Sequence, residues 1–409
     1  MSTPGNGVAD SVVIVGGGLA GFSAAKELRK RGFDGSLTIV DPNPFLYDRP
    51  PLSKDFLIGT FSEQDIELES AEWFQQNRIE LRQASVEKLN ADRASVSISS
   101  GQELAADAVL LATGGIARKL PIPGGDLPTV LELRNLADAR RLMACLKSGD
   151  SLIIVGAGLI GAEVASSASS CGVIVTLIDP VEVPLVPAVG PELAVQLHGM
   201  HADHGVTVVT GMPSEIRFDG SRHVVDLQDG RSFSADNVLV GIGIVADTGL
   251  ATDAGLEVDN GTIVNLRQQS SNPAIFAAGD SSRYRSESGD LIRRAEHWEA
   301  AIRSGETAAA SILGQSPQEY GAGWFWSDRY KVHVEGVGDM NVSGRTILRE
   351  RDGKPFAAFR VSDAGVLVGA ASIDGGLTIR AARRIIDLRK MVDDDKLADP
   401  SIDLRKLAR

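Results

Sequence analysis

The sequence is poor in cysteine, with only Cys145 and Cys171, and these two stand in separate segments without a Cys-x-x-C pair. This scarcity excludes a disulfide scaffold, a thiolate-bound metal cluster and a dithiol relay within the chain. We expect both cysteines to behave as small, partly buried apolar residues. The compartment that fits best is a reducing cytosol.

An excess of basic residues and long apolar runs are also lacking. The net charge is −13, whereas a nucleic-acid-binding protein normally presents a basic face. The most apolar segment, residues 153–164, contains three glycines and Glu163 and is too short to span a bilayer. The first ten residues lack the basic and apolar regions of a secretion signal. We therefore expect a soluble, cytoplasmic protein of two or three domains that binds no nucleic acid.

A glycine-rich turn near the N-terminus carries the first functional signal. The apolar run at residues 12–15 leads into Gly16, Gly18 and Gly21, which have G-x-G-x-x-G spacing and precede a helix-forming segment. This pattern is typical of a dinucleotide-binding fold, in which the helix N-terminus receives a pyrophosphate. The next apolar run ends in Asp41, at the distance where such folds place a ribose-binding carboxylate.

The same pattern occurs a second time. Gly156, Gly158 and Gly161 have the same spacing, a helix-forming segment follows them, and the next strand ends in Asp179. The repeat predicts two dinucleotide sites. Asp179 would accept a hydrogen bond from a free 2′-hydroxyl but would repel a 2′-phosphate, and residues 180–184 supply no Arg or Lys. We therefore expect the nicotinamide cofactor at one site to be NADH.

Other segments indicate how the chain is organised. Residues 107–115, 237–243 and 273–280 read as buried strands that close on small residues, and the proline-rich segment 42–54 reads as a rigid, exposed loop that ends in Lys54. After residue 320 we expect an antiparallel sheet, followed by a helix from about 378 to 392. Three histidines stand at H-x-x-H-x-x-H spacing on a predicted helix, and they diverge too far around its axis to bind one metal ion. These are His198, His201 and His204.

Together these features resemble the FAD-dependent pyridine nucleotide reductases related to glutathione reductase, and the resemblance covers the chain from end to end. Residues 47–54, Tyr-Asp-Arg-Pro-Pro-Leu-Ser-Lys, are similar to the signature of the oxygenase-coupled NADH:ferredoxin reductases of biphenyl and toluene dioxygenase systems and of putidaredoxin reductase. The resemblance implies an α/β fold with two Rossmann-like dinucleotide-binding domains and a C-terminal α+β domain. The implied bounds are 1–114 with 244–322 for FAD, 115–243 for NADH and 323–409 for the C-terminal domain.

The resemblance also implies roles for individual residues. Lys54, Glu163 and Trp298 match catalytic positions: Lys54 and Glu163 resemble a pair near the flavin N5 and the nicotinamide, and Trp298 matches an aromatic beside the flavin ring. Trp326 is a candidate for the electron exit, against the alternative that the aromatic cluster of residues 324–330 only packs a core. The residues matched to FAD binding are Gly16, Gly18, Leu19, Ala20, Gly21, Asp41, Arg49, Pro50, Lys54, Val86, Ala112, Thr113, Gly114, Arg134, Gly279, Asp280, His297 and Trp298. Those matched to NADH binding are Gly156, Gly158, Leu159, Ile160, Gly161, Asp179, Gly241, Ile242 and Gly243. We also expect a helix to start after Asp280 and to place its N-terminus at the flavin.

The implied reaction is hydride transfer from NADH to FAD, followed by release of single electrons to a [2Fe–2S] ferredoxin, plant-type or Rieske-type, that serves a terminal oxygenase. A basic cluster at residues 380–390 is a candidate ferredoxin surface, and the alternative is a helix solvated by its arginines. Two alternatives to the implied reaction stay open. One is reduction of another acceptor, rubredoxin or oxygen, and the other is an NADH-responsive interaction protein like the apoptosis-inducing factors. The sequence also leaves a homodimer open.

Overall fold

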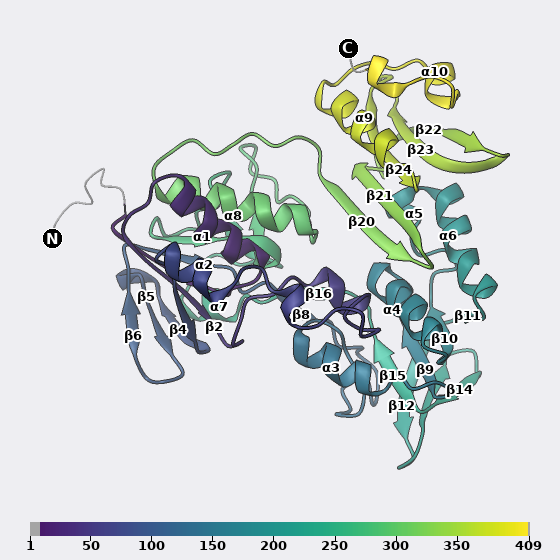
Figure 1. Ribbon diagram of the computed structural model, residues 1–409, viewed down its shortest axis with the longest axis horizontal. Coiled ribbons are helices and arrows are strands. Elements are labelled where there is room, and N and C mark those ends of the chain that lie inside the picture. The colour runs from purple at the N-terminus through teal and green to yellow at the C-terminus, as the bar shows by residue number, and fades with distance from the viewer. Residues whose placement is uncertain (1–8, 408–409) are drawn as a thin grey trace. The chain divides into compact units, whose positions relative to one another are not determined.

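The computed structural model describes residues 9–407, which form two compact units (Figure 1). Of the described residues, the first unit comprises 9–48, 63–116 and 244–320, and the second comprises 49–62, 117–243 and 321–407. The chain crosses between the units at the paired strands β8 (Gly115–Ala117) and β16 (Ile244–Ala246), and also after residues 48, 62 and 320. Residues 49–54 of the proline-rich segment thus fold with the second unit, as does the C-terminal sheet. The division of the chain into an FAD-binding, an NADH-binding and a C-terminal domain stays a prediction.

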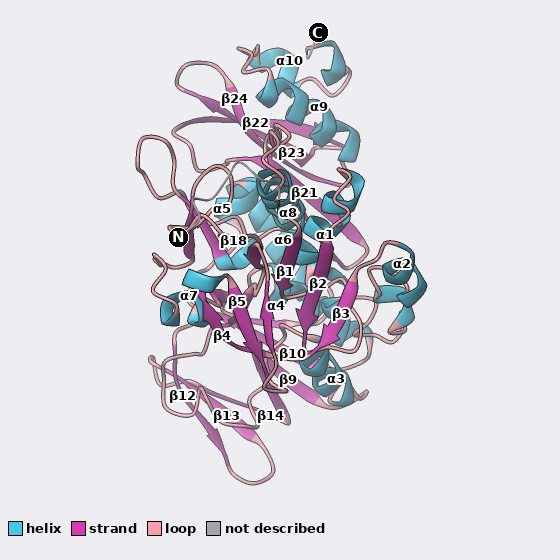
Figure 2. Cartoon of the chain, turned by 90° about the vertical axis from the view of Figure 1, so that its left-hand side faces the viewer, coloured by secondary structure: helices cyan, strands magenta, loops and turns pink. Residues whose placement is uncertain are grey.

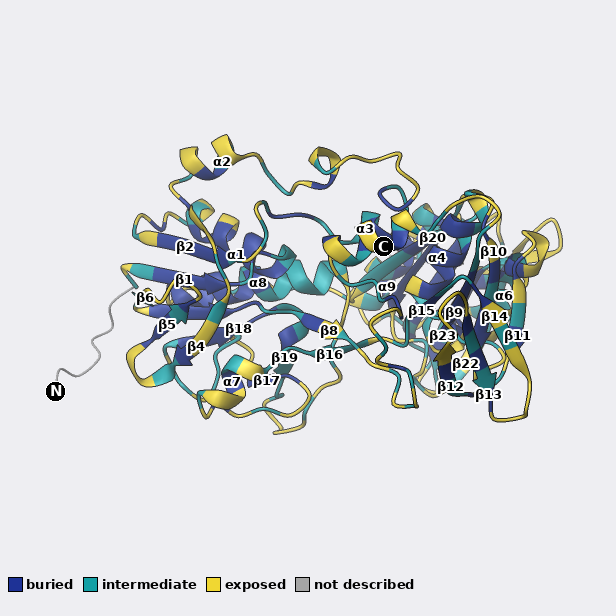
Figure 3. Cartoon of the chain, turned by 90° about the horizontal axis from the view of Figure 1, so that it is seen from below, coloured by how far each residue is buried: buried dark blue, intermediate teal, exposed yellow. Residues whose placement is uncertain are grey.

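The first unit is built on a parallel sheet in the order β18-β7-β1-β2-β3 (Figure 2). Four of its strands, β18, β7, β1 and β2, are short, mainly buried apolar runs, and the edge strand β3 is polar and exposed. Strand β1 is among the buried strands of Figure 3, and its residues Val12 to Val15 are buried. Helices α1 (Leu19–Lys30) and α8 (Trp298–Ile312) pack together, and Gly305 of α8 lies so close to Ala20 that a side chain would clash there. The strands are β1 (Ser11–Val15), β2 (Ser36–Asp41), β3 (Glu80–Gln83), β7 (Ala108–Leu111) and β18 (Ile275–Ala277).

Smaller elements complete the first unit. An antiparallel three-stranded sheet in the order β4-β5-β6 follows β3, and β17 pairs with β19. The bounds are α2 (Ala71–Gln76), β4 (Val86–Asn90), β5 (Ser95–Ile98), β6 (Glu103–Ala105), α7 (Gly249–Asp253), β17 (Thr262–Val264) and β19 (Ser282–Tyr284).

The second unit contains another parallel sheet, in the order β11-β10-β9-β15. Helix α4 follows strand β9 in the chain. Cys145 and Cys171 are unpaired and half-buried against its core, which confirms the expectation for both. The elements are α3 (Leu136–Ala144), β9 (Ser151–Val155), α4 (Leu159–Ser170), β10 (Ile174–Asp179), α5 (Val186–Val189), α6 (Pro191–Asp203), β11 (Thr207–Thr210), β12 (Pro213–Phe218), β13 (His223–Leu227), β14 (Ser232–Ala235) and β15 (Asn237–Val240).

The expected C-terminal antiparallel sheet is present, in the order β20-β21-β24-β23-β22, and one of its faces is covered by α9. The helix ends at Asp387 rather than near 392, because Arg389 takes a left-handed conformation with φ +49°. The elements are β20 (Trp324–Arg329), β21 (Val332–Gly338), β22 (Gly344–Arg351), β23 (Lys354–Ser362), β24 (Leu367–Ile373), α9 (Gly376–Asp387) and α10 (Asp394–Ala398). No helix among residues 9–407 is long and apolar enough to cross a membrane.

Candidate functional site

Both parallel sheets have a topological switch point, where ligands bind in folds of this kind. In the first unit the strand order reverses between β1 and β7, and in the second between β9 and β15. The carboxyl ends of β1 and β9 are the two glycine turns. The neighbouring strand ends supply Ala112 to Gly114 in one unit and Gly241 to Gly243 in the other. The predicted site residues at each turn therefore meet at the edge where a dinucleotide would bind.

The first glycine turn has the backbone geometry that only glycine allows. Gly16 has φ +100°, and its N–H donates to the carbonyl of Val40 at 2.8 Å. A Cβ at Gly16 would clash with the carbonyl of Ala112, and a Cβ at Gly21 would clash with the carbonyl of Gly16. The tight turn and the close approach of α1 to β1 thus both require glycine.

The second turn repeats this geometry. Gly156 has φ +105°, its N–H donates to the carbonyl of Ile178 at 2.8 Å, and a Cβ there would stand 2.5 Å from the carbonyl oxygen of Gly241. A Cβ at Gly161 would clash with the carbonyl of Gly156. The repeat seen in the sequence is therefore a repeat in three dimensions.

The two acidic residues also serve the turns directly. Oδ2 of Asp41 accepts the N–H of Gly17, and Oδ2 of Asp179 accepts the N–H of Ala157, both at 2.7 Å. In each case Oδ1 accepts the N–H two residues further on, at 2.9 Å from Asn43 and 2.8 Å from Val181. The sequence predicts only a ribose role for these carboxylates, and the structure adds that they hold the glycine turns in shape.

The N-termini of α1 and α4 suit an anion. Neither helix, both fully described, has a side-chain cap or an acidic residue in its first turn, so its first N–H groups and its dipole are directed at the turn. A Cβ at Gly158 would meet no atom within 4 Å, so the backbone there is open to close approach. The residues present therefore fit a dinucleotide pyrophosphate at each turn.

Cofactor preference can be tested at the second turn. Asp179 is half-buried and Glu182 is exposed. In Asp179→Asn with Glu182→Arg we expect kcat/KM for NADPH relative to NADH to rise by roughly 10- to 100-fold, because two charges that repel the 2′-phosphate are removed and one that attracts it is added. Steady-state ferricyanide reduction with each cofactor measures the ratio. Glu182→Gln alone is the control for loss of the second carboxylate. An unchanged ratio in the double variant would contradict the role of Asp179.

Further first-unit residues were predicted to contact FAD. Gly114 and Gly279 have φ +75° and +72°, Val86 begins β4, and His297 caps α8 just before Trp298. The indole Nε1 of Trp298 donates to both carboxylate oxygens of Asp48, at 3.0 and 3.1 Å, and this fixes the ring. Burial lowers the pKa of His297, although Asp280 opposes this shift, so the imidazole is neutral at pH 7.

The expectation of a helix after Asp280 is wrong. A single 3₁₀ turn, Gly279–Ser281, is followed at once by strand β19. The segment pairs with β17 instead of forming a helix, and the helix of this region, α8, begins at Trp298. Any helix dipole directed at a flavin from this side would have to come from α8.

Arg49, Pro50, Lys54 and Arg134 fold with the second unit. Arg49 and Pro50 begin the 3₁₀ turn Pro50–Ser53, and the backbone N–H of Arg134 donates to Asp138 at the start of α3. Their contacts with a cofactor held by the first unit stay a prediction. The loop was expected to be exposed, but Leu52 and Ser53 are buried and the Lys54 side chain is only 14% exposed.

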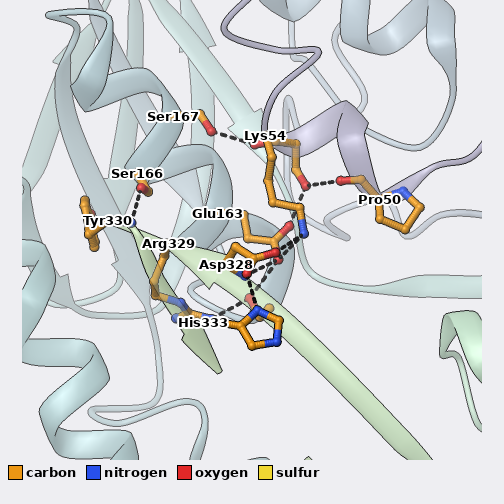
Figure 4. A network of polar contacts seen from close by, with 11 residues as sticks. Pro50, Lys54, Glu163, Ser166, Ser167, Asp328, Arg329, Tyr330 and His333 are labelled. Carbon is orange, nitrogen blue, oxygen red and sulfur yellow. Dashed lines mark hydrogen bonds and ion pairs between the residues drawn. The ribbon is translucent and has the colours of Figure 1, made fainter. Parts of the chain in front are cut away.

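Lys54 and Glu163 meet in the second unit (Figure 4). Glu163 lies on α4 and is 4% exposed, and its Oε1 is 3.5 Å from the Lys54 Nζ. Ser53 and Ser327 donate to its two oxygens at 2.5 and 2.7 Å. Ser167, one turn further along α4, donates to the carbonyl of Ser53 at 2.7 Å. The loop, α4 and β20 are thus joined through one buried carboxylate.

A second carboxylate, Asp328 of β20, extends this network to the surface. Its Oδ2 is 3.0 Å from the Lys54 Nζ, and its Oδ1 is 2.5 Å from Nδ1 of His333. Burial alone would raise the pKa of Asp328, but the hydrogen bond with His333 and the Lys54 ammonium outweigh it and lower the pKa. The ammonium also lies 5.5 Å from the ring of Trp326, which stacks on Trp324.

Four residues of this network were not predicted as site residues from the sequence: Ser53, Ser327, Asp328 and His333. The available signal was the polar pair Ser327 and Asp328 inside a run of aromatic residues, since polar side chains in a buried strand need partners.

His198 and His201 lie on α6 and His204 caps its C-terminus. Among residues 9–407, no group of three or more His, Cys, Asp or Glu side chains is arranged to hold a metal ion. His201 is buried, and its Nδ1 bonds to the hydroxyl of Tyr330 at 2.7 Å, while His204 stacks on the Tyr330 ring. Burial, with nearby Arg329, lowers the pKa of His201 to about 3. The cluster packs the tip of the β20–β21 hairpin onto α6.

Acid should destabilise the protein through His201. Its folded pKa, about 3, lies below the ordinary value of 6.5, so the unfolded chain binds more protons between these values. The stabilisation is complete above pH 6.5 and is lost as the pH falls towards 3, by about 2 kcal/mol at pH 5. We expect the thermal midpoint to fall between pH 7 and 5, and to fall less in His201→Met. Equal slopes in both proteins would contradict this.

Comparisons with known proteins agree with this geometry. Residues 10–305 match the family described as pyridine nucleotide-disulphide oxidoreductase, and residues 324–408 match the family described as reductase C-terminal. The chain is 34% identical over 98% of both chains to the ferredoxin–NAD(+) reductase subunit of a benzene 1,2-dioxygenase system from Pseudomonas putida. It is equally similar, with the same coverage, to the ferredoxin reductase component of a chlorobenzene dioxygenase from Cupriavidus sp. (strain PS12).

A solved structure is similar along nearly the whole chain. In the covalent putidaredoxin reductase–putidaredoxin complex, the matching chain has a TM-score of 0.91 and 31% identity, with 97% of this chain and 98% of that chain covered. The fold is therefore α/β, with two Rossmann-like parallel sheets and a C-terminal antiparallel sheet. From the matched profile, the full-length relatives and the two glycine turns, the chain belongs to the pyridine nucleotide-disulphide oxidoreductase family, whose members are FAD- and NAD(H)-dependent oxidoreductases.

Proposed function

We propose that this protein is an NADH:ferredoxin reductase, which passes electrons from NADH through bound FAD to a [2Fe–2S] ferredoxin that serves a terminal oxygenase of aromatic catabolism. The observation that carries the proposal is the duplicated glycine turn, because the reaction needs one site for a resident flavin and one for an exchanging nicotinamide. The ferredoxin acceptor is supported by the relatives, which are named as reductase components of benzene and chlorobenzene dioxygenase systems.

We assign FAD to the first turn and NADH to the second. In the first, Gly16 to Gly21 and the α1 N-terminus would hold the pyrophosphate, and Asp41 a ribose. In the second, Gly156 to Gly161 and the α4 N-terminus would do the same for NADH, with Asp179 selecting the free 2′-hydroxyl. Bound FAD would supply the chemistry, because a flavin accepts a hydride and gives up electrons one at a time.

The protein's own part is binding, orientation and charge. Trp298 is the first residue of α8, and its indole ring is held by a hydrogen bond to Asp48. A ring fixed in this way could form one wall of a flavin site. Lys54 brings a positive charge that Glu163 and Asp328 keep in place. Such a charge would attract and orient an electron-rich ring system placed beside it.

Acceptor assays test the proposal. The purified holoprotein should reduce ferricyanide with NADH, and cytochrome c reduction should depend on an added [2Fe–2S] ferredoxin, plant-type in one arm and Rieske-type in another. If only rubredoxin stimulated cytochrome c reduction, rubredoxin would be the acceptor and not ferredoxin. Fast NADH oxidation by oxygen without any carrier would make oxygen the acceptor. Slow turnover with dimerisation on NADH addition would favour an NADH-responsive interaction protein. If NADH reduced none of these acceptors, the assignment of the protein as an NADH-dependent reductase would be contradicted.

A basic surface on α9 offers a place for the ferredoxin. Arg380 and Arg384 are exposed and Arg383 is half-buried. The carboxylate of Asp387, the acidic residue within this cluster, accepts the backbone N–H of Ala322 at 2.6 Å. A positive patch of this kind would steer an acidic ferredoxin to the C-terminal domain.

Charge reversal tests this surface. In Arg383→Glu with Arg384→Glu we expect the KM for ferredoxin to rise by about tenfold at low salt, because long-range attraction is replaced by repulsion. NADH–ferricyanide turnover should stay unchanged. The matched control is Arg351→Glu with Lys354→Glu, which makes the same change of charge at the exposed β22–β23 turn. Equal effects of the two double variants would show that net charge, and not α9, matters.

A further inference from the structure

The carboxylate of Glu163 is engaged mainly by donors other than Lys54. Oε2 accepts from Ser53 at 2.5 Å, and Oε1 accepts from the Ser327 hydroxyl at 2.7 Å and from the backbone N–H of Asp328 at 3.3 Å. The Lys54 ammonium, at 3.5 Å, is the most distant of these partners. Glu163 therefore satisfies polar groups of the loop and of β20 more than it serves as the partner of the lysine.

Asp328 is the closer partner of Lys54. Its Oδ2 lies 3.0 Å from the ammonium, within ordinary hydrogen-bond distance, and its Oδ1 accepts from His333 (Figure 4). The side chain of Asp328 is 40% exposed, against 5% for Glu163, so it stays ionised at a lower desolvation cost. A charge-assisted hydrogen bond at this distance fixes the position of the ammonium.

His333 orients this carboxylate. Asp328 and His333 are directly opposite each other on the antiparallel strands β20 and β21, so their side chains lie on the same face. The backbone N–H of His333 is fixed by Asp374, which follows β24, at 2.9 Å, and its Nε2 lies 3.8 Å from Glu335 of β21. Nδ1 is thereby held against one oxygen of Asp328 and leaves the other directed at Lys54.

We propose that Asp328, oriented by His333, is the positioning residue that fixes the Lys54 ammonium, and that Glu163 is the clamp that joins the loop, α4 and β20. The arrangement of these four residues is argued from the geometry of the second unit alone. Its consequence for catalysis rests on the proposed function, in which Lys54 acts beside the cofactors.

Competitive acetylation of the holoprotein tests the proposal. Acetic anhydride reacts with neutral amines, so the extent of Lys54 labelling at fixed pH, measured by mass spectrometry and normalised to the unfolded chain, reports how strongly the ammonium is held. We expect Asp328→Asn to raise Lys54 labelling about tenfold and Glu163→Gln by less than threefold, because the shorter charge-assisted hydrogen bond, at 3.0 Å against 3.5 Å, withholds the amine from the reagent more strongly. His333→Leu should raise it by about threefold, and His333→Gln, which keeps a donor, should restore the original value.

Thermal unfolding of the same variants separates positioning from stability. Glu163→Gln should lower the thermal midpoint more than Asp328→Asn does, because it disturbs the buried acceptor of two serines. Asp352→Asn, in the β22–β23 turn, is the control and should change neither readout. Stronger labelling in Glu163→Gln than in Asp328→Asn, or no change in either, would overturn the proposal. NADH–ferricyanide turnover is measured separately, so that failure of the proposed function leaves the labelling result intact.

Discussion

Gly158→Val is expected to fold, to keep its FAD and to lose NADH-dependent turnover. Gly158 has φ −67° and ψ −166°, a conformation that valine adopts readily, and a Cβ there meets no protein atom within 4 Å. The side chain would instead fill the space where the pyrophosphate must approach the α4 N-terminus. We expect kcat/KM for NADH to fall at least about 100-fold, equivalent to roughly 3 kcal/mol of binding.

Stopped-flow reduction at increasing NADH concentrations measures this loss. The control is Gly199→Val, since Gly199 is exposed on α6 of the same unit and a Cβ there also meets no atom within 4 Å. This variant should behave like the original protein. A Gly158→Val protein with unchanged NADH kinetics would show that the second turn is not the nicotinamide site.

Gly16→Val is expected to give a colourless protein. Valine is strongly strained at φ +100°, and its Cβ would clash with the carbonyl of Ala112, so the turn that faces the switch point of the first sheet cannot form. We expect a destabilisation of roughly 3 kcal/mol or more and loss of the flavin. Flavin absorbance per chain and the thermal midpoint are the measurements.

The matched control for this change is Gly101→Ala. Gly101 has φ +81° in the turn between β5 and β6, and a Cβ there has no neighbour within 4 Å. The expected cost is only about 1 kcal/mol, with full FAD content, because backbone strain is then the only penalty. If Gly16→Val stayed yellow, or if Gly101→Ala lost its flavin equally, the first turn would not be the flavin anchor.

The glycine turns and their acids could be predicted from the sequence because their geometry is local. The turn at Gly16 and the strand that leads to Asp41 follow from residue spacing and from the conformations that only glycine allows. Likewise, the antiparallel C-terminal sheet followed from alternating short apolar runs. The end of α9 could not be predicted because residues 388–392 contain neither glycine nor proline, and the left-handed residue that ends the helix is Arg389.

The polar network could be predicted only in part. Lys54 and Glu163 were paired by resemblance, but the contacts of Ser53 and Asp328 join residues more than 100 positions apart in the chain. No local pattern encodes such contacts, because they depend on how the loop, α4 and β20 pack. The turn-holding role of Asp41 was missed for a different reason, since one carboxylate can serve both backbone and ribose.

The central claim, that electrons pass from NADH through FAD to a [2Fe–2S] ferredoxin, is tested most directly by anaerobic stoichiometry. One equivalent of NADH should bleach the flavin of the purified holoprotein, and in a coupled titration each NADH consumed should reduce two equivalents of ferredoxin. Flavin that NADH fails to bleach, or bleached flavin whose electrons do not reach any [2Fe–2S] ferredoxin, would contradict the account.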